Sequence, residues 1–302
     1  MAEGPGTAKP LIADIGSLGV CTLIWSTTWR AIKLQLGPVP PLDSVVYRFA
    51  LAAGLLFLWC AVTRRSLALN RRQHLDALGQ GFCGFSLQYA LVYLAEEKIA
   101  SGAMAVIFAA TPFVNLVLFR FALGQKASGR AWIATLMGLA GVAALSLSQV
   151  SASPSGGGAA IGVLIAFGGV FAAAFGNFFA ARGQAAGAAV APSTAWAMGY
   201  GALMVAAYVL ATGHAWRFEP SVRYVGALVY LAGFGSVIAF VTYYALARRR
   251  GYAFASYVAA LTPPAAMLIS TLTEGARWGL AALAGLALVL AGQALLMGSA
   301  RG

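Results

Sequence analysis

One charged residue, Arg48, lies well inside an apolar run of the sequence. The run begins near Asp43, and in a helix Arg48 would lie about 8 Å further in. A charge at such a depth is costly, so it has to face a cavity or a partner. Arg48 can therefore bind the carboxylate of a solute near the outer mouth of a cavity. Alternatively, it can extend to the membrane interface or bond to a structural backbone carbonyl.

Acidic residues are missing from the middle of the apolar runs. Asp14, Asp43 and Asp76 stand at the starts of runs, while His74 and His214 fall in loops or at the edge of a run. Proton relays inside membranes use Asp, Glu or His. We therefore expect weak or no proton coupling and a poor site for cations. The cysteines offer no metal-ligand spacing, so we also expect no metal and no cofactor.

Aromatic and neutral polar side chains are the remaining candidates for a site. Amide and hydroxyl groups in lipid must find partners, so they turn toward the interior. Rings offer stacking surface and amides fix polar atoms, which suits a neutral or zwitterionic solute with an apolar side chain. Taken singly, each can instead serve interhelical bonding or an interfacial aromatic belt. The predicted substrate-binding set is Trp25, Ser26, Trp29, Arg48, Gln88, Tyr89, Asn115, Asn177, Trp196, Tyr200 and Tyr243.

The composition requires most of the exterior to face lipid. Of 302 residues, 61% are hydrophobic and only 9% are charged, against about 25% charged in soluble domains. A membrane helix needs about 20 mostly apolar residues. The basic residues fall between the apolar runs, so the net charge of +12 does not indicate nucleic acid. The ten predicted spans are 12–33, 43–63, 75–95, 99–121, 130–149, 159–181, 192–211, 224–246, 252–272 and 278–298.

The Lys and Arg residues predict the orientation. With the N-terminus in the cytoplasm, the cytoplasmic loops receive 13 of them and the outer loops 6. Cytoplasmic loops are enriched in Lys and Arg, so we expect both termini in the cytoplasm. We also expect the chain in a bacterial inner membrane. The stretch 151–158 is rich in Ser and Gly and predicts a flexible linker between residues 1–150 and 159–302.

Several residues occupy matching positions in the two halves of the chain. A shift of 151 residues aligns Tyr93 with Tyr244, and Thr111-Pro112 with Thr262-Pro263. Each half has five predicted spans, so the second half enters the membrane from the opposite side. We therefore predict an all-α membrane protein of ten transmembrane helices, arranged as two inverted five-helix repeats around a central cavity.

Several short motifs resemble the drug/metabolite transporter superfamily, in particular its EamA-type ten-helix exporters. They are Ile24-Trp25-Ser26-Thr27, Tyr47-Arg48-Phe49, the stretch from Tyr93 to Gly102 followed by Thr111-Pro112-Phe113, and the counterpart from Tyr244 to Pro263. The chain looks most similar to the aromatic amino acid exporters. The resemblance implies a two-repeat transporter with a central cavity. The Gly-Glu that the family often has after the fourth span of each half is Gly124-Gln125 and Glu274-Gly275 here.

The expected function is export of small neutral or zwitterionic metabolites, amino acids including aromatic ones, by alternating access and without proton coupling. The expected partners are a small-molecule substrate and the lipid bilayer. A proton-coupled exporter of other metabolites or drugs is an alternative. A membrane-embedded enzyme or a scramblase is less favoured, because the sequence lacks the His, Asp or metal clusters that an enzyme needs.

Two pairs of residues are predicted to serve the conformational change. Tyr93 and Tyr244 occupy matched positions near opposite faces and could close the path as gates, or could be interfacial anchors. Pro112 and Pro263 interrupt helix hydrogen bonding and could act as hinges. Small residues four apart, such as Ala134 and Gly138, indicate close helix packing, either inside the chain or between two copies, so we expect a monomer or a homodimer.

Overall fold

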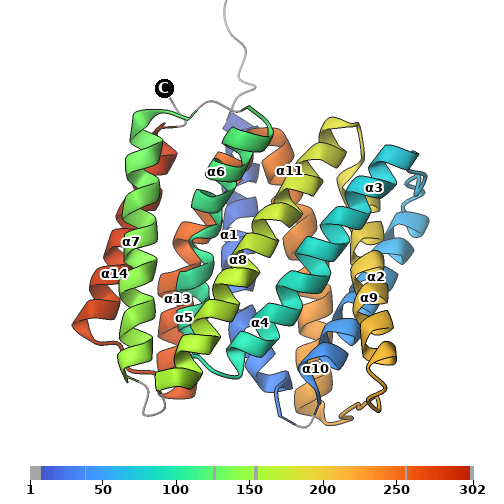
Figure 1. The fold of residues 1–302 in the computed structure, drawn as a ribbon. Coiled ribbons are helices and arrows are strands. Elements are labelled where there is room, and N and C mark those ends of the chain that lie inside the picture. The colour runs from blue at the N-terminus through green and yellow to red at the C-terminus, as the bar shows by residue number, and fades with distance from the viewer. Residues whose placement is uncertain (1–7, 38, 125–126, 153–155, 256, 300–302) are drawn as a thin grey trace, which may run out of the picture.

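The computed structural model describes residues 8–37, 39–124, 127–152, 156–255 and 257–299, and its named elements are all helices (Figure 1). They are α1 (Ala8–Gln35), α2 (Pro41–Val62), α3 (Arg71–Gln80), η1 (Gly81–Leu87), α4 (Gln88–Glu96), α5 (Ser101–Phe108), α6 (Thr111–Ala122), α7 (Gly129–Ala152), α8 (Gly156–Ala185), α9 (Val190–Ala211), α10 (Val222–Tyr230), η2 (Leu231–Ile238), α11 (Ala239–Arg250), α12 (Tyr252–Ala255), α13 (Tyr257–Glu274) and α14 (Leu280–Ser299).

The helices confirm an all-α membrane protein. In the described part of the chain, six segments are long and apolar enough to cross a membrane. A shorter apolar helix covers Leu280–Leu296. An apolar medium leaves backbone groups no water to bond, and helices satisfy these groups internally. The six segments are Pro41–Val62, Ser101–Ala122, Gly129–Ser148, Gly157–Ala185, Val190–Ala211 and Val222–Arg250.

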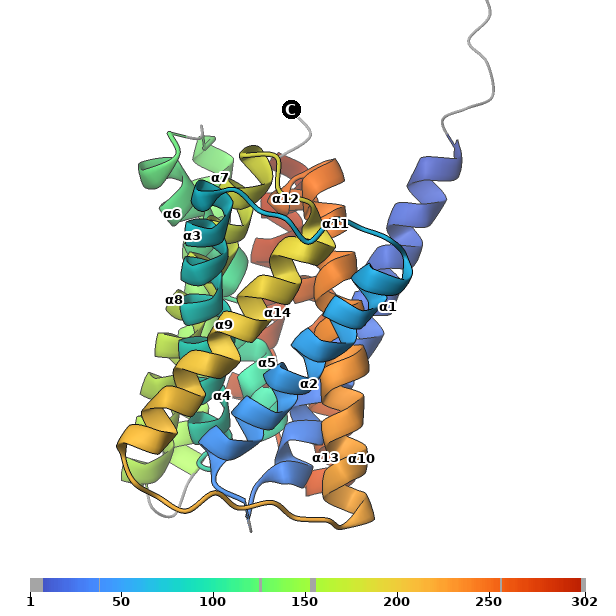
Figure 2. The same cartoon turned by 90° about the vertical axis from the view of Figure 1, so that its right-hand side faces the viewer.

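The two ends of the bundle differ in what they carry. We call the end at which α1 begins and α14 ends the terminal end, and the other the distal end (Figure 1). The run α3–η1–α4 starts at the terminal end and finishes at the distal end, while α10–η2–α11 runs the other way (Figures 1 and 2). These two runs are the predicted third and eighth spans, so they have opposite directions.

The predicted linker is largely helical. Helix α7 continues to Ala152 and α8 begins at Gly156, so residues 151–152 and 156–158 belong to helices. Residues 153–155 lie outside the described residues.

Two π-helical segments, η1 and η2, interrupt the third and eighth spans. Shifted by 151 residues, 81–87 becomes 232–238, which lies within η2. Sequence patterns gave no sign of either segment. A π-turn widens the helix and leaves backbone carbonyls free for other partners, and such turns are common at functional sites.

Helices α7 and α14 pack so closely that their backbones touch at glycine residues. A Cβ on Gly141 would lie 2.6 Å from the Gly285 carbonyl oxygen, and one on Gly292 would lie 2.8 Å from the Ala134 oxygen. Such contacts need residues without side chains. The small residues around Ala134 and Gly138 are therefore used in a contact inside the chain.

Replacing Gly141 by Ala should lower the thermal unfolding midpoint of the purified protein, because the new methyl group forces α7 and α14 apart. Overpacking of this kind costs about 1–3 kcal/mol. Gly54 is the matched control, since it also lies inside a helix and a Cβ there meets no atom within 4 Å. Equal midpoints for Gly141→Ala and Gly54→Ala would contradict the close contact.

Candidate functional site

A cavity lies between elements of both halves of the chain. Its walls are mainly aromatic and aliphatic, and Arg48 is the only Arg, Lys, Asp or Glu among the described residues that line it. The lining consists of Trp25, Thr28, Trp29, Ile32, Arg48, Gln88, Tyr89, Val92, Ala105, Phe108, Ala109, Thr111, Pro112, Asn115, Ala173, Asn177, Phe240, Tyr243, Tyr244, Val258, Ala259 and Thr262.

Trp25 anchors the aromatic wall. Its ring centroid lies 5.2 Å from those of Phe240 and Tyr243, in edge and tilted arrangements that aromatic rings favour. Its indole Nε1 donates to the Gly235 carbonyl in η2 at 3.3 Å. The π-helical segment of the second half thus positions an aromatic side chain of the first half.

Arg48 is held in place by neutral groups. Its Nε donates to Ser236 Oγ in η2 at 3.0 Å, and its guanidinium carbon lies 4.4 Å from the centroid of the Tyr89 ring. Arg48 is only 1% exposed. Its Nη1 is buried without a hydrogen-bond partner in the described part of the chain. Arg48 therefore lies in the cavity wall with one hydrogen-bond donor unused.

Three other lining residues carry unused polar atoms. Trp29 Nε1, Thr111 Oγ1 and Asn115 Oδ1 are buried, and none has a hydrogen-bond partner among the residues described. Buried polar groups are normally satisfied. These atoms are unused polar groups in a mostly apolar wall.

Eight predicted binding residues line the cavity and three do not. Ser26 is buried between α1 and α13, where it bonds to the Thr22 carbonyl. Trp196 donates to the Leu67 carbonyl at 2.9 Å, and Tyr200 Oη lies 2.9 Å from His74 Nδ1. Trp196 and Tyr200 therefore join α9 to α3 and its preceding loop. Those that line the cavity are Trp25, Trp29, Arg48, Gln88, Tyr89, Asn115, Asn177 and Tyr243.

The two predicted gate tyrosines lie in different settings. Tyr244 lines the cavity and stacks on Phe240 with centroids 5.7 Å apart. Tyr93 is fully buried outside the lining, and its hydroxyl donates to Gln35 Oε1 at 2.6 Å. That bond joins the C-terminal part of α4 to the end of α1, at the distal end.

The two predicted hinges also differ. The helix is interrupted at residues 109–110, between α5 and α6, just before Pro112. Gln293 of α14 donates to the Ala109 carbonyl there at 2.8 Å, which satisfies a group left free by the interruption. In the second half, α13 continues through Pro263.

The acids at the span starts all have partners. Asp14 pairs with Arg249 and Arg250, with closest distances of 3.0 and 2.5 Å. Asp76 lies 3.3 Å from Arg182. Each pair ties together segments far apart in the sequence at the terminal end, so these carboxylates serve structure.

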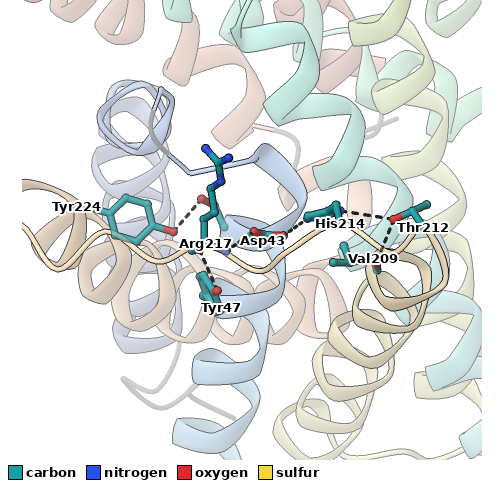
Figure 3. A network of polar contacts seen from close by, with 8 residues as sticks. Asp43, Tyr47, Val209, Thr212, His214, Arg217 and Tyr224 are labelled. Carbon is teal, nitrogen blue, oxygen red and sulfur yellow. Dashed lines mark hydrogen bonds and ion pairs between the residues drawn. The ribbon is translucent and has the colours of Figure 1, made fainter.

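Asp43 holds the strap that joins α9 to α10, residues 212–221, across the start of α2. Figure 3 shows its carboxylate between His214 and Arg217. His214 Nε2 lies 2.8 Å from Oδ1, and the Arg217 backbone N–H donates to Oδ2 at 3.0 Å. Tyr47 donates to the Arg217 carbonyl at 2.9 Å. The strap is thereby fixed over the distal end.

Some site residues escaped the sequence analysis. Phe108, Thr111 and Phe240 line the cavity but stand in apolar or motif contexts without a signal of their own. Glu96, expected beyond the end of a span, is 0% exposed. Neither of its carboxylate oxygens has a hydrogen-bond partner in the described residues, although Lys33 Nζ donates to its backbone carbonyl.

The helical bundle and its cavity are those of a membrane protein, and comparison with known proteins identifies the family. The model of the EamA-like transporter family matches residues 15–147 and 160–298. The chain belongs to this family, which confirms the resemblance drawn from the motifs.

Relatives and a solved structure extend this likeness. The chain is 31% identical over 270 residues to the uncharacterized inner membrane transporter YedA of Escherichia coli K12, covering 87% of this chain and 83% of YedA. Protein PagO of Salmonella typhimurium is 28% identical over 35% of each chain. A crystal structure with a TM-score of 0.69 and 19% identity, covering 96% of this chain and 98% of that one, has the same fold.

Asp43→Asn should lower the thermal unfolding midpoint, because the amide loses the charge and one of two acceptor oxygens. Leaving buried groups unpaired costs about 1–3 kcal/mol. Arg223, which is exposed beside the same strap, provides the control Arg223→Gln. If both variants unfold at the wild-type temperature, the carboxylate does not hold the strap.

Proposed function

We propose that this protein exports small neutral or zwitterionic metabolites, amino acids including aromatic ones, by alternating access and without proton coupling. One observation carries the proposal: a cavity between the two halves combines aromatic walls with unpartnered polar atoms on Arg48, Trp29 and Asn115. Solute sites are concave and mostly apolar, with a few polar groups that fix orientation. A transporter explains these features better than an enzyme or a scramblase does.

The architecture proposed for this function is ten membrane crossings in two inverted five-helix repeats, residues 1–150 and 159–302. Three findings support it. The family model matches each half separately, η1 and η2 occupy equivalent positions, and the helix runs that contain them point in opposite directions (Figure 1). Inverted repeats with a site at their interface are a known design of secondary transporters.

The proposed setting is the bacterial inner membrane with the terminal end in the cytoplasm. The inner membrane transporter YedA supports the first part. The excess of Lys and Arg in the loops at the terminal end supports the second. A small-molecule substrate and the bilayer are the proposed partners, and both a monomer and a homodimer are compatible with the proposal.

Uptake of labelled amino acids into proteoliposomes tests the function. Phenylalanine should enter proteoliposomes faster than it enters empty liposomes. Trp25→Ala should raise the half-saturating concentration by about 10–100-fold, which corresponds to the free energy of burying one aromatic side chain. Trp216→Ala, outside the cavity lining and 37% exposed, should stay within about threefold of the wild type. Equal uptake with and without protein for a panel of amino acids would refute the function.

A second candidate, a proton-coupled exporter of other metabolites or drugs, is favoured by Glu96. This carboxyl group is buried with no hydrogen-bond partner among the residues that the structure describes, and it lies one turn from Val92 of the cavity wall. Such a residue in a membrane helix can carry a proton. An imposed pH gradient should leave the uptake rate unchanged in the main proposal. Acceleration that disappears with an ionophore and in Glu96→Gln would instead establish the coupled mechanism.

Gating is tested by the accessibility of a single cysteine placed in the cavity. We propose that Tyr93 closes the distal side and Tyr244 the terminal side. Tyr93→Ala should raise labelling from outside and Tyr244→Ala labelling from the cytoplasmic side, because each removes a large ring from one closure. Tyr208, which is 60% exposed, gives the control Tyr208→Ala. Unchanged labelling and transport in both gate variants would favour interfacial anchors.

A further inference from the structure

Arg48 is a buried cation without an anion. The ion pairs among the described residues use Asp14, Asp43 and Asp76, each with another base. Glu274 accepts from Ser101 and Ser270 instead. Because arginine stays protonated in proteins, the positive charge of Arg48 is permanent.

The surroundings of Arg48 do not neutralise this charge. Ser236 offers a hydroxyl, and the Tyr89 and Phe49 rings offer their faces, with the guanidinium carbon 4.4 and 5.2 Å from the ring centroids. A buried charge is costly unless it is paired and fully hydrogen-bonded. Here one terminal nitrogen, Nη1, has no hydrogen-bond partner in the described residues.

The cavity that Arg48 lines has no compensating acid among its described residues. The empty site therefore carries one positive charge. A monoanion brings the site to neutrality, whereas a zwitterion leaves the excess charge in place and a cation doubles it. The low dielectric constant of the interior makes these differences large.

We propose that the cavity binds monoanionic carboxylates with an aromatic or apolar body, that Arg48 binds the carboxylate, and that an ammonium group is dispensable. Guanidinium groups match carboxylates in shape and charge. Trp25, Trp29 and Phe240 supply surface for the apolar body. The inference rests on the proposed function, because it assumes that this cavity is the transport site, and it goes beyond the neutral and zwitterionic solutes proposed above by assigning monoanions to that site.

A matched set of probes separates the contributions of the two charged groups. 3-Phenylpropionate has the carboxylate alone, phenylalanine has both charges, phenethylamine has the ammonium alone and 3-phenylpropanamide is uncharged. Binding of each probe is measured by calorimetry on the full chain in nanodiscs, and its movement is measured in proteoliposomes. We expect 3-phenylpropionate to bind at least as tightly as phenylalanine, and phenethylamine to bind about 100-fold more weakly, the scale of one charge-assisted contact.

Substitution of Arg48 tests the residue itself. Arg48→Gln should weaken 3-phenylpropionate binding about 100-fold and change 3-phenylpropanamide binding by less than about threefold, since only the first probe uses the charge. Arg48→Lys should restore part of the loss. If Arg48→Gln fails to fold, Ser236→Ala provides a second test, because it keeps the charge of Arg48 but removes the hydrogen-bond partner of Nε. Ser236→Ala should weaken the binding of 3-phenylpropionate and leave the binding of 3-phenylpropanamide unchanged.

The outcomes distinguish the inference from the function. Transport of phenylalanine with 3-phenylpropionate bound more than tenfold more weakly would overturn the inference and leave the proposed function standing. Equal losses for the charged and uncharged probes in Arg48→Gln would also overturn it. If none of the four probes binds or moves, both proposals fail. Tight binding of the carboxylates with loss only in the Arg48 and Ser236 variants supports the inference.

Discussion

The free-energy cost of leaving a charge or a polar group without a partner inside an apolar bundle determines how the polar side chains of this protein are arranged. Near the bundle ends, Asp14 pairs with Arg249 and Arg250, and Glu274 accepts hydrogen bonds from the Ser101 and Ser270 hydroxyl groups. Gln293 satisfies the carbonyl exposed by the interruption between α5 and α6. In the described part of the chain, Nη1 of Arg48 and both carboxylate oxygens of Glu96 are among the buried polar atoms that have no hydrogen-bond partner. Ionisable groups inside a membrane helix are candidates for a functional role.

Close backbone contacts join the two halves beside the cavity. Gly141 and Gly292 bring α7 and α14 together, and a Cβ on Gly176 would lie 2.8 Å from the Gly84 Cα, so α8 and η1 are in similar contact. The π-helical segment η2 then directs Gly235 and Ser236 toward Trp25 and Arg48, so one local distortion orients two parts of the wall.

The sequence predicted the class of fold and much of the cavity because charge and apolar length are strong signals. Arg48 was found because it interrupts an apolar run, and its position in the wall followed from the cost of burying it. The sequence placed Trp196 and Tyr200 at the cavity, but they lie on another face. Helix α9 is apolar all round, so no amphipathic pattern shows which of its sides faces the cavity. Ser236 and Glu96 escaped because their roles depend on contacts with distant helices, which spacing along the chain does not reveal.

The interruption at residues 109–110 makes the two halves unequal in shape, since α13 passes through Pro263 and Pro264 without a break. If inverted repeats exchange their conformations during a transport cycle, the break would move from one half to the other. The Ala109 carbonyl would then recover its helical partner and release Gln293, and α13 would open near Thr262. In these terms, the half whose proline helix is broken would show which of two states, related by exchange of the repeat conformations, the structure represents.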